Sequence, residues 1–242
     1  MKIINIILAV LITGILFFVG FRLFTPVHAA TLFGIGQSMG ASTTLVITAG
    51  ATNKTMLFWS KKTDLNPGFA VWFGQGADNI VWTIAQRGAG GGNRMSCQTA
   101  GTLADSGTVP NTGVWNGYAC TLGGGVSTIY HFNLDMSLIG SGTGTDGTIT
   151  SDSLYIGTRG GGASSWNGAI RAVQIFPYTM TIKQIQNALM ATSPYKIGSP
   201  SYFFPLTADT DVRGWLNGAR LVLQVFTAGT TVADPPIGLL MW

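Results

Sequence analysis

The chain has 242 residues and a formal net charge of +4, with 9% charged residues and 34 glycines. This length suits one folded domain, and the low charge means that Ser, Thr, Asn, Gln and Gly supply most of the solvated surface. Nucleic-acid binding is not expected, because basic residues are densest only at Lys61 with Lys62 and at Arg87 with Arg94 around a glycine run.

The N-terminal 29 residues form a leader. Residues 3–21 are an almost unbroken apolar run behind Lys2, and Val27 and Ala29 match the small-residue pattern before a signal-peptidase site. The run also approaches the length that spans a bilayer, so a cleaved signal peptide and an uncleaved membrane anchor both fit. Both interpretations predict export, with the folded domain over residues 30–242.

Beyond the leader, short segments rich in β-branched and aromatic residues alternate with turn residues. One helix is expected over residues 181–191, with Ile182, Ile185 and Leu189 on one face and a capping box at its start. This pattern predicts an all-β sandwich or jelly roll with one short helix. The expected strands cover residues 43–50, 55–61, 68–76, 80–88, 93–101, 116–122, 127–135, 153–159 and 169–176.

The last of these segments contains an irregular pattern. Ile170 and Val173 are three residues apart, whereas Val173 and Ile175 keep the strand period of two. We therefore expect a β-bulge near Arg171 and Ala172.

Two cysteines, Cys97 and Cys120, lie in expected strands. Outside a reducing cytosol such a pair often forms a disulfide. The sequence does not show how closely their Cα atoms approach, so a disulfide and two separate buried thiols are both compatible with it.

Four segments in order, NTGVWNGYACTL, STIYHFNLDMSLIGSG, SDSLYIGTRGGG and SWNGAIRAVQIFPYTMTIKQIQNAL, resemble the concanavalin A-like, laminin-G-like jelly roll. The resemblance implies a jelly-roll sandwich in a family that contains both glycan binders and glucanases. It also implies calcium as a possible cofactor, held by aspartate carboxylates and backbone carbonyls. The possible donors are Asp135, Asp146, Asp152, Asp209 and Asp211.

The residues argue against catalysis. Glycoside hydrolysis needs two carboxyl groups around the scissile bond, and the chain contains no glutamate. The nearest aspartate pair, Asp209 and Asp211, is more typical of a turn before Trp215. His131 lies in an expected strand without a nucleophile motif, and the glycines of GTRGGGAS lack the Lys-Ser/Thr ending and the helix of a phosphate-binding loop.

Sugar binding needs an aromatic platform and a few hydrogen-bonding groups on loops. We therefore expect an exported, non-catalytic binding or adhesion module for a glycan or a surface protein, either secreted or anchored by residues 3–21. One alternative is a self-associating structural component of a surface assembly, such as a virion surface, spike or filament; a glycoside hydrolase is a weaker one. The candidate ligand contacts are Arg159, Trp166, Asn167, Asn93, Arg94, Trp215 and Asn217.

Overall fold

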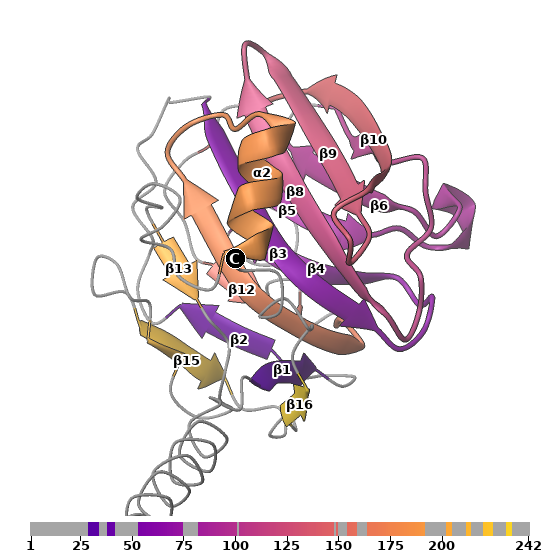
Figure 1. Ribbon diagram of the computed structural model, residues 1–242, viewed down its shortest axis with the longest axis vertical. Coiled ribbons are helices and arrows are strands. Elements are labelled where there is room, and N and C mark those ends of the chain that lie inside the picture. Colours follow the sequence, from indigo (N-terminus) through magenta and orange to yellow (C-terminus); the bar gives the residue numbers. More distant parts are fainter. Residues whose placement is uncertain are drawn as a thin grey trace, which may run out of the picture.

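The chain forms two antiparallel β-sheets packed face to face, with one helix on the outside (Figure 1). The structure is a computed structural model. It describes residues 53–74, 82–100, 102–147, 149, 154–158 and 164–191 in full. For residues 29–33, 38–41, 202–204, 212–213, 220–224 and 231–233 it describes the strands alone. The prediction of an all-β jelly-roll sandwich with one short helix is confirmed.

The first sheet, called sheet A, has the strand order β10-β9-β8-β3-β12-β1-β16, with β13 also paired to β12. Its strands are β1 (Ala29–Phe33), β3 (Lys54–Lys62), β8 (Trp115–Gly123), β9 (Val126–Phe132), β10 (Leu138–Thr145), β12 (Gly168–Phe176), β13 (Tyr202–Phe204) and β16 (Thr231–Ala233).

The second sheet, sheet B, has the order β14-β15-β2-β11-β4-β5-β6-β7. A short 3-10 helix, η1 (Ala89–Gly91), joins β5 to β6. The strands are β2 (Ser38–Ala41), β4 (Gly68–Phe73), β5 (Trp82–Gln86), β6 (Met95–Thr99), β7 (Ala104–Asp105), β11 (Leu154–Ile156), β14 (Val212–Arg213) and β15 (Arg220–Gln224).

Strand β3 shows how the two apolar layers arise. Successive side chains of a strand point to opposite faces. Met56 and Phe58 enter the main core between the sheets, whereas Leu57 and Trp59 enter a second cluster on the outer face of sheet A. All four are fully buried. A strand with apolar residues on both faces must be covered on both sides.

The cover on the outer face is α2 (Ile182–Met190), which crosses β3, β8 and β12 (Figure 1). The predicted capping box is confirmed: the Thr181 hydroxyl accepts from the Gln184 backbone N–H, and the Gln184 side chain accepts from the Thr181 backbone N–H. Ile185 and Leu189 are buried as predicted, but Ile182 is exposed, and Ala188 completes the buried face instead.

The sheet also holds the carboxyl-terminal end of α2. The Trp59 indole N–H donates to the Leu189 carbonyl oxygen at 2.8 Å, and the Gln174 amide donates to the Ala188 carbonyl oxygen at 3.3 Å. The last carbonyls of a helix have no partner within it. Two buried side chains of the sheet supply those partners here.

The predicted β-bulge in β12 is confirmed. The register against β3 shifts between Arg171 and Gln174, and Ala172 has a φ of 53°. The extra residue lets Ile170, Val173 and Ile175 all point into the main core. Burial lowers the pKa of Arg171 to about 10, since its guanidinium loses water at the bulge.

One edge of the sandwich is closed by glycines of β10. A Cβ at Gly142 would lie 1.7 Å from the Asp105 carbonyl oxygen, and Cβ atoms at Gly140 and Gly144 would lie 2.5 and 2.6 Å from the Ser106 and Thr102 carbonyl oxygens. The backbone segment around β7 therefore lies directly against β10.

Cys97 of β6 and Cys120 of β8 form a disulfide, with Cα atoms 5.9 Å apart. The bond crosses the core and joins sheet B to sheet A. The Trp82 indole N–H donates to the Cys120 sulfur at 3.1 Å. Of the two alternatives left open by the sequence, the structure has the disulfide.

Candidate binding groove

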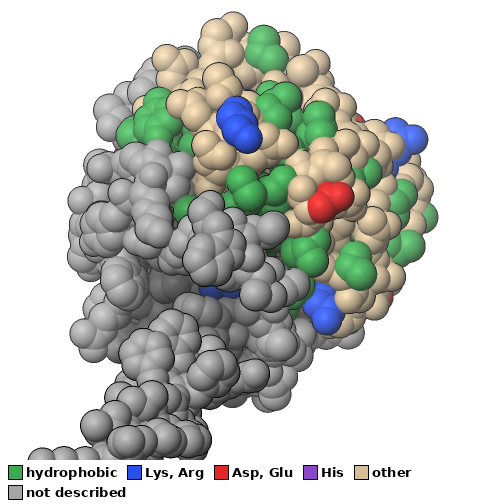
Figure 2. Space-filling model, in the orientation of Figure 1, with side chains coloured by type: hydrophobic (Ala, Val, Ile, Leu, Met, Phe, Trp, Pro, Cys, Tyr) green, Lys and Arg blue, Asp and Glu red, His purple; other side chains and the backbone are tan. Residues whose placement is uncertain are grey.

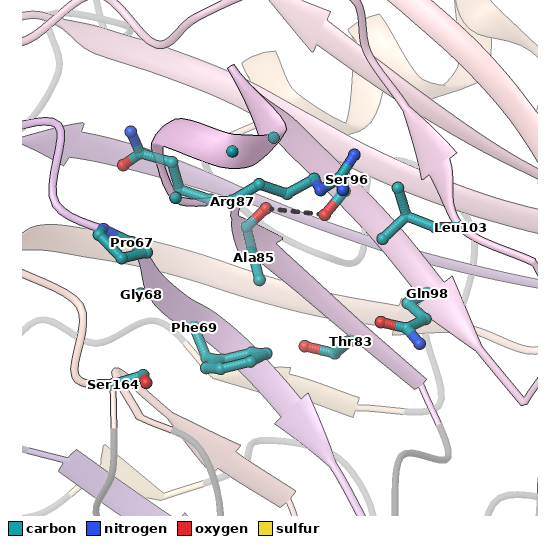
Figure 3. A pocket seen from close by; sticks show the side chains of 14 residues that line it. Pro67, Gly68, Phe69, Thr83, Ala85, Arg87, Ser96, Gln98, Leu103 and Ser164 are labelled. Carbon is teal, nitrogen blue, oxygen red and sulfur yellow. Dashed lines mark hydrogen bonds between the residues drawn. The ribbon is translucent and has the colours of Figure 1, made fainter. Parts of the chain in front are cut away.

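A groove of about 530 Å³ lies on the outer face of sheet B (Figure 3). Alternation along β5 and β6 explains its floor. Trp82, Ile84 and Cys97 point into the main core, so the residues between them point outward. The outward residues that form the floor are Thr83, Ala85, Ser96 and Gln98. Because α2 covers sheet A, the groove and the helix lie on opposite sides of the molecule.

The floor is polar and mostly ordered by backbone contacts. The Thr83 hydroxyl donates to the Val71 carbonyl oxygen at 2.7 Å, and the Ser96 hydroxyl donates to the Ala85 carbonyl oxygen at 3.3 Å. Each hydroxyl oxygen keeps lone pairs that can accept another hydrogen bond. Gln98 adds an amide group, half-buried, that can both donate and accept.

Phe69 of β4 is the aromatic member of the groove. Its half-buried ring meets the buried Trp72 ring edge-on, with centroids 5.0 Å apart and planes at 88°. The Phe69 backbone N–H donates to the Ser164 carbonyl oxygen at 3.1 Å, which fixes the start of β4 against the neighbouring segment. Figure 3 shows the ring beside Thr83 and Ser164. The ring therefore packs against Trp72 beside the polar floor.

Arginines stand at the end of the groove near η1. Arg87 lines the groove, and its guanidinium lies 3.3 Å from the Asp105 carboxylate. Arg94 reaches the same carboxylate oxygen at 3.8 Å. Among the described residues that line the groove, none carries a carboxyl group.

A family model for the concanavalin A-like lectin/glucanases superfamily matches residues 36–186, which is 151 of the 242 residues. The chain belongs to this superfamily. No protein of curated function matches the chain significantly.

Solved structures with a similar fold match the chain at low identity. One is a Bacteroides ovatus protein to which carbohydrate binding has been provisionally assigned, with 15% identity and a TM-score of 0.65. The match covers 86% of this chain and 60% of that protein, so the chain spans less than two thirds of its length. Another is the heptameric SAP-like pentraxin of Limulus polyphemus, with 14% identity, a TM-score of 0.54, and coverage of 86% and 93%. At these identities the likeness establishes the fold.

Within this superfamily fold, the structure places Trp166 away from the surface where the sequence suggested a ligand contact, and it places Asn167 in a half-buried contact between two segments. Trp166 is fully buried in the main core, so its ring faces no ligand. The buried Lys62 ammonium lies 4.5 Å from the centre of that ring. The Asn167 amide donates to the Asp64 carboxylate at 2.7 Å. Both residues fasten the β3–β4 connection to the start of β12.

The ion pair in that connection has shifted pKa values. Burial lowers the pKa of Lys62, although Asp64, 3.4 Å away, acts in the other direction. Burial raises the pKa of Asp64, but hydrogen bonds from Asn167 and Asn66 and the charge of Lys62 outweigh it, so the net shift is downward. The connection therefore holds one basic and one acidic side chain beside each other, each with a shifted pKa.

Asn93 and Arg94 lie in the β5–β6 connection beside the groove, as part of the rim and not of its floor. The Asn93 carbonyl oxygen accepts from the Gln86 amide at 3.2 Å, and the Asn93 backbone has a φ of 54°. Three other predicted contacts, Arg159, Trp215 and Asn217, lie outside the described residues.

The possible calcium donors do not converge in the described part of the chain. Asp135 and Asp146 flank the eight residues of β10, which span about 25 Å. The Asp135 carboxylate accepts from the Ser137 backbone N–H and hydroxyl, and these bonds lower its pKa. Among the described residues no three His, Cys, Asp or Glu side chains gather. Asp152, Asp209 and Asp211 lie outside them.

His131 is a structural residue of the core. It is fully buried, with Nδ1 2.8 Å from the Thr108 hydroxyl and Nε2 3.0 Å from the Asn116 side-chain oxygen. Asn116 uses its amide nitrogen to donate to two backbone carbonyls, so its oxygen accepts and Nε2 carries the proton. Burial lowers the pKa of His131 to about 4. The imidazole is therefore neutral at pH 7.

The sequence did not single out Phe69, Thr83, Ser96 and Gln98 as site residues. Their common signal is alternation: each occupies an outward position between buried residues of its strand. That signal exists in the sequence, but it identifies a face of one strand, and the groove is formed by three strands together.

Proposed function

We propose that the chain is an exported, non-catalytic carbohydrate-binding module that holds its ligand in the groove on sheet B. The observation that carries the proposal is the pairing of an aromatic ring, Phe69, with a polar floor of hydroxyl and amide groups. Sugars have apolar faces that pack on aromatic rings and hydroxyl groups that exchange hydrogen bonds with such a floor.

The composition favours binding over hydrolysis. Glycosidases use two carboxyl groups with different pKa values. The chain has no glutamate, and Asp105, which lies beside the arginines at the groove rim, is paired with both of them. The superfamily contains both lectins and glucanases, and a groove whose described lining has no carboxyl group supports the binding role in our proposal.

Export is the second part of the proposal. The apolar run of residues 3–21 lies outside the described residues, and among those described no helix is both long and apolar enough to cross a membrane. Support comes from the disulfide between Cys97 and Cys120, since such bonds persist in oxidising compartments. N-terminal sequencing of the mature protein is expected to begin at Ala30; a start at Met1 would indicate an anchor instead.

The binding proposal is tested on a glycan array followed by titration of the best ligand. Phe69→Ala is expected to weaken binding about tenfold, which corresponds to 1.4 kcal/mol. Tyr130→Ala is the matched control, because Tyr130 is a half-buried aromatic residue on the outer face of sheet A. A calcium chelator is expected to leave binding unchanged, since no described residue lining the groove has a carboxyl group.

Two results would overturn the proposal. One is a blank array from protein that is folded and monomeric by native mass spectrometry. The other is binding that survives Phe69→Ala but is lost in Tyr130→Ala. An ordered assembly seen by electron microscopy, together with a blank array, would favour the structural role on a surface.

A further inference from the structure

The loop between Arg87 and Arg94 is built so that both arginines face the groove side of sheet B. The Arg87 backbone N–H donates to the Arg94 carbonyl oxygen at 2.9 Å, so the two residues face each other at the end of the β5–β6 hairpin. Arg87 is two residues after Ala85 and Arg94 is two residues before Ser96, so both continue the outward-pointing positions of β5 and β6. They therefore lie on the same face as the groove floor.

Glycines make room for the two side chains. A Cβ at Gly91 would lie 2.6 Å from both Cβ and Nε of Arg87, and a Cβ at Gly92 would lie 3.1 Å from Nε of Arg94. Gly92 also has a φ of 68°, which side chains rarely adopt. The glycine run thus lets both guanidinium groups fold back over the loop towards the rim.

The charges at this rim do not balance. Both guanidinium groups share one carboxylate oxygen of Asp105, whose other oxygen accepts from the Gly107 backbone N–H. Arg87 and Arg94 remain 40% and 48% exposed. One carboxylate therefore faces two cations, and a positive charge is left over beside the groove.

This surplus stands out because the chain has few charges. On the face seen in Figure 2, the charged side chains of the described surface are few and scattered. The other ion pair near the groove, Lys62 with Asp64, has one charge of each sign. The rim beside Arg87 is thus a local site for an anion.

We propose that the groove binds an acidic saccharide, one carrying a carboxylate or a sulfate, with the anionic group held by Arg87 and Arg94. This inference rests on the proposed function and names the ligand class of the same groove. The planar guanidinium fork matches the geometry of carboxylate and sulfate oxygens. Phe69 and the polar floor would hold the sugar ring, and the arginines would select its charge.

The test compares ligands that differ only in charge. Binding of oligogalacturonate and its methyl ester, and of dextran sulfate and dextran, is measured by calorimetry at low and at high salt. The acidic member of at least one pair is expected to bind more tightly, and the difference is expected to shrink at high salt because salt screens exposed charges. A difference within the oligogalacturonate pair would indicate a preference for carboxylate, and a difference within the dextran pair a preference for sulfate.

Variants assign the preference to the two arginines. Arg87→Gln and Arg94→Gln are each expected to weaken acidic binding about fivefold, the size of an exposed ion pair, so that the ratio of acidic to neutral affinity falls. Lys183→Gln is the matched control, because it removes one exposed charge from α2 on the other side of the molecule. Asp105→Asn is expected to strengthen acidic binding about fivefold, since it frees both guanidinium groups.

Each outcome decides the matter. Equal binding of the acidic and neutral members overturns this inference and leaves carbohydrate binding intact. No binding of any member overturns this inference, and the glycan array then decides separately whether the proposed function stands. A charge preference that persists in the Arg87→Gln/Arg94→Gln double variant also overturns the inference, because the anion would then be recognised elsewhere.

Discussion

Replacing Cys97 and Cys120 together by alanine is expected to lower the free energy of unfolding by about 3 kcal/mol. The two residues are 23 positions apart, and opening a loop of that size restores about 11 cal/mol/K of entropy to the unfolded chain, or about 3 kcal/mol at 25 °C. The lost contact between the Trp82 indole and the Cys120 sulfur acts in the same direction.

Urea unfolding followed by tryptophan fluorescence measures this change. The double variant is expected to unfold at lower urea, with a steeper dependence on urea because its unfolded chain is less restricted. A reductant provides the control. It should lower the urea midpoint of the parent protein to that of the double variant, and it should leave the midpoint of the double variant unchanged.

Two observations would refute the reasoning. The parent protein and the double variant could unfold at the same urea concentration, with no effect of reductant on either. Alternatively, thiol titration of the unfolded, unreduced parent could find two free cysteines. Either result would mean that the sheets are not joined covalently and that packing alone holds them together.

Three further predictions concern the core, one sheet edge and the helix. Because the pKa of His131 is about 4 in the folded protein and near 6.5 in the unfolded chain, the stability contributed by burying the neutral imidazole is fully present above pH 6.5. The free energy of unfolding then falls by about 3 kcal/mol as the pH is lowered from 6.5 through 4. Urea unfolding at a series of pH values should show this fall, and His131→Gln should abolish the pH dependence. Gly142→Ala is expected to cost about 3 kcal/mol or more, since its Cβ would meet the Asp105 carbonyl, whereas Thr143→Ala on the exposed side of β10 should hardly change the melting temperature. Thr181→Ala should cost about 1 kcal/mol in thermal unfolding, and Thr181→Ser should restore it; equal losses would contradict the capping role.

The central strands and the helix could be predicted because their signals are local. The pattern around Ile170 and Val173 predicts the bulge at Ala172, and the spacing of Thr181 and Gln184 predicts the helix start. Both depend on side chains a few residues apart. Ile182 was misplaced for the same reason, because only the packing of α2 on sheet A decides which side of its first turn is covered.

Strand β10 could not be recognised from propensity. Its sequence, LIGSGTGT, resembles a loop, since glycines and small polar residues disfavour strands in isolation. Contact with the segment around β7 overrides the low strand propensity of this sequence, because only glycine leaves room for the backbone of that segment. The period of two in Gly140, Gly142 and Gly144 was the available signal.

The candidate site was even less accessible to sequence reasoning. Trp166 beside a glycine run resembled a loop platform, but it is a core residue whose neighbour Asn167 fixes a connection. The groove depends on the register that brings Phe69 opposite Ala85 and Ala85 opposite Ser96. Register between strands is set by the whole sheet, so no single segment shows it.

The closure of the sandwich at β10 also bears on aggregation. β10 and β7 are the terminal strands of their sheets, and terminal strands are templates to which another chain can add. Here the two ends cover each other, and Thr102 and Thr145 each donate a backbone N–H to the side-chain hydroxyl of the other. A protein with so few charges has little electrostatic repulsion to keep its copies apart. By letting the β7 segment cover β10, the glycines of β10 also protect the protein from edge-to-edge association.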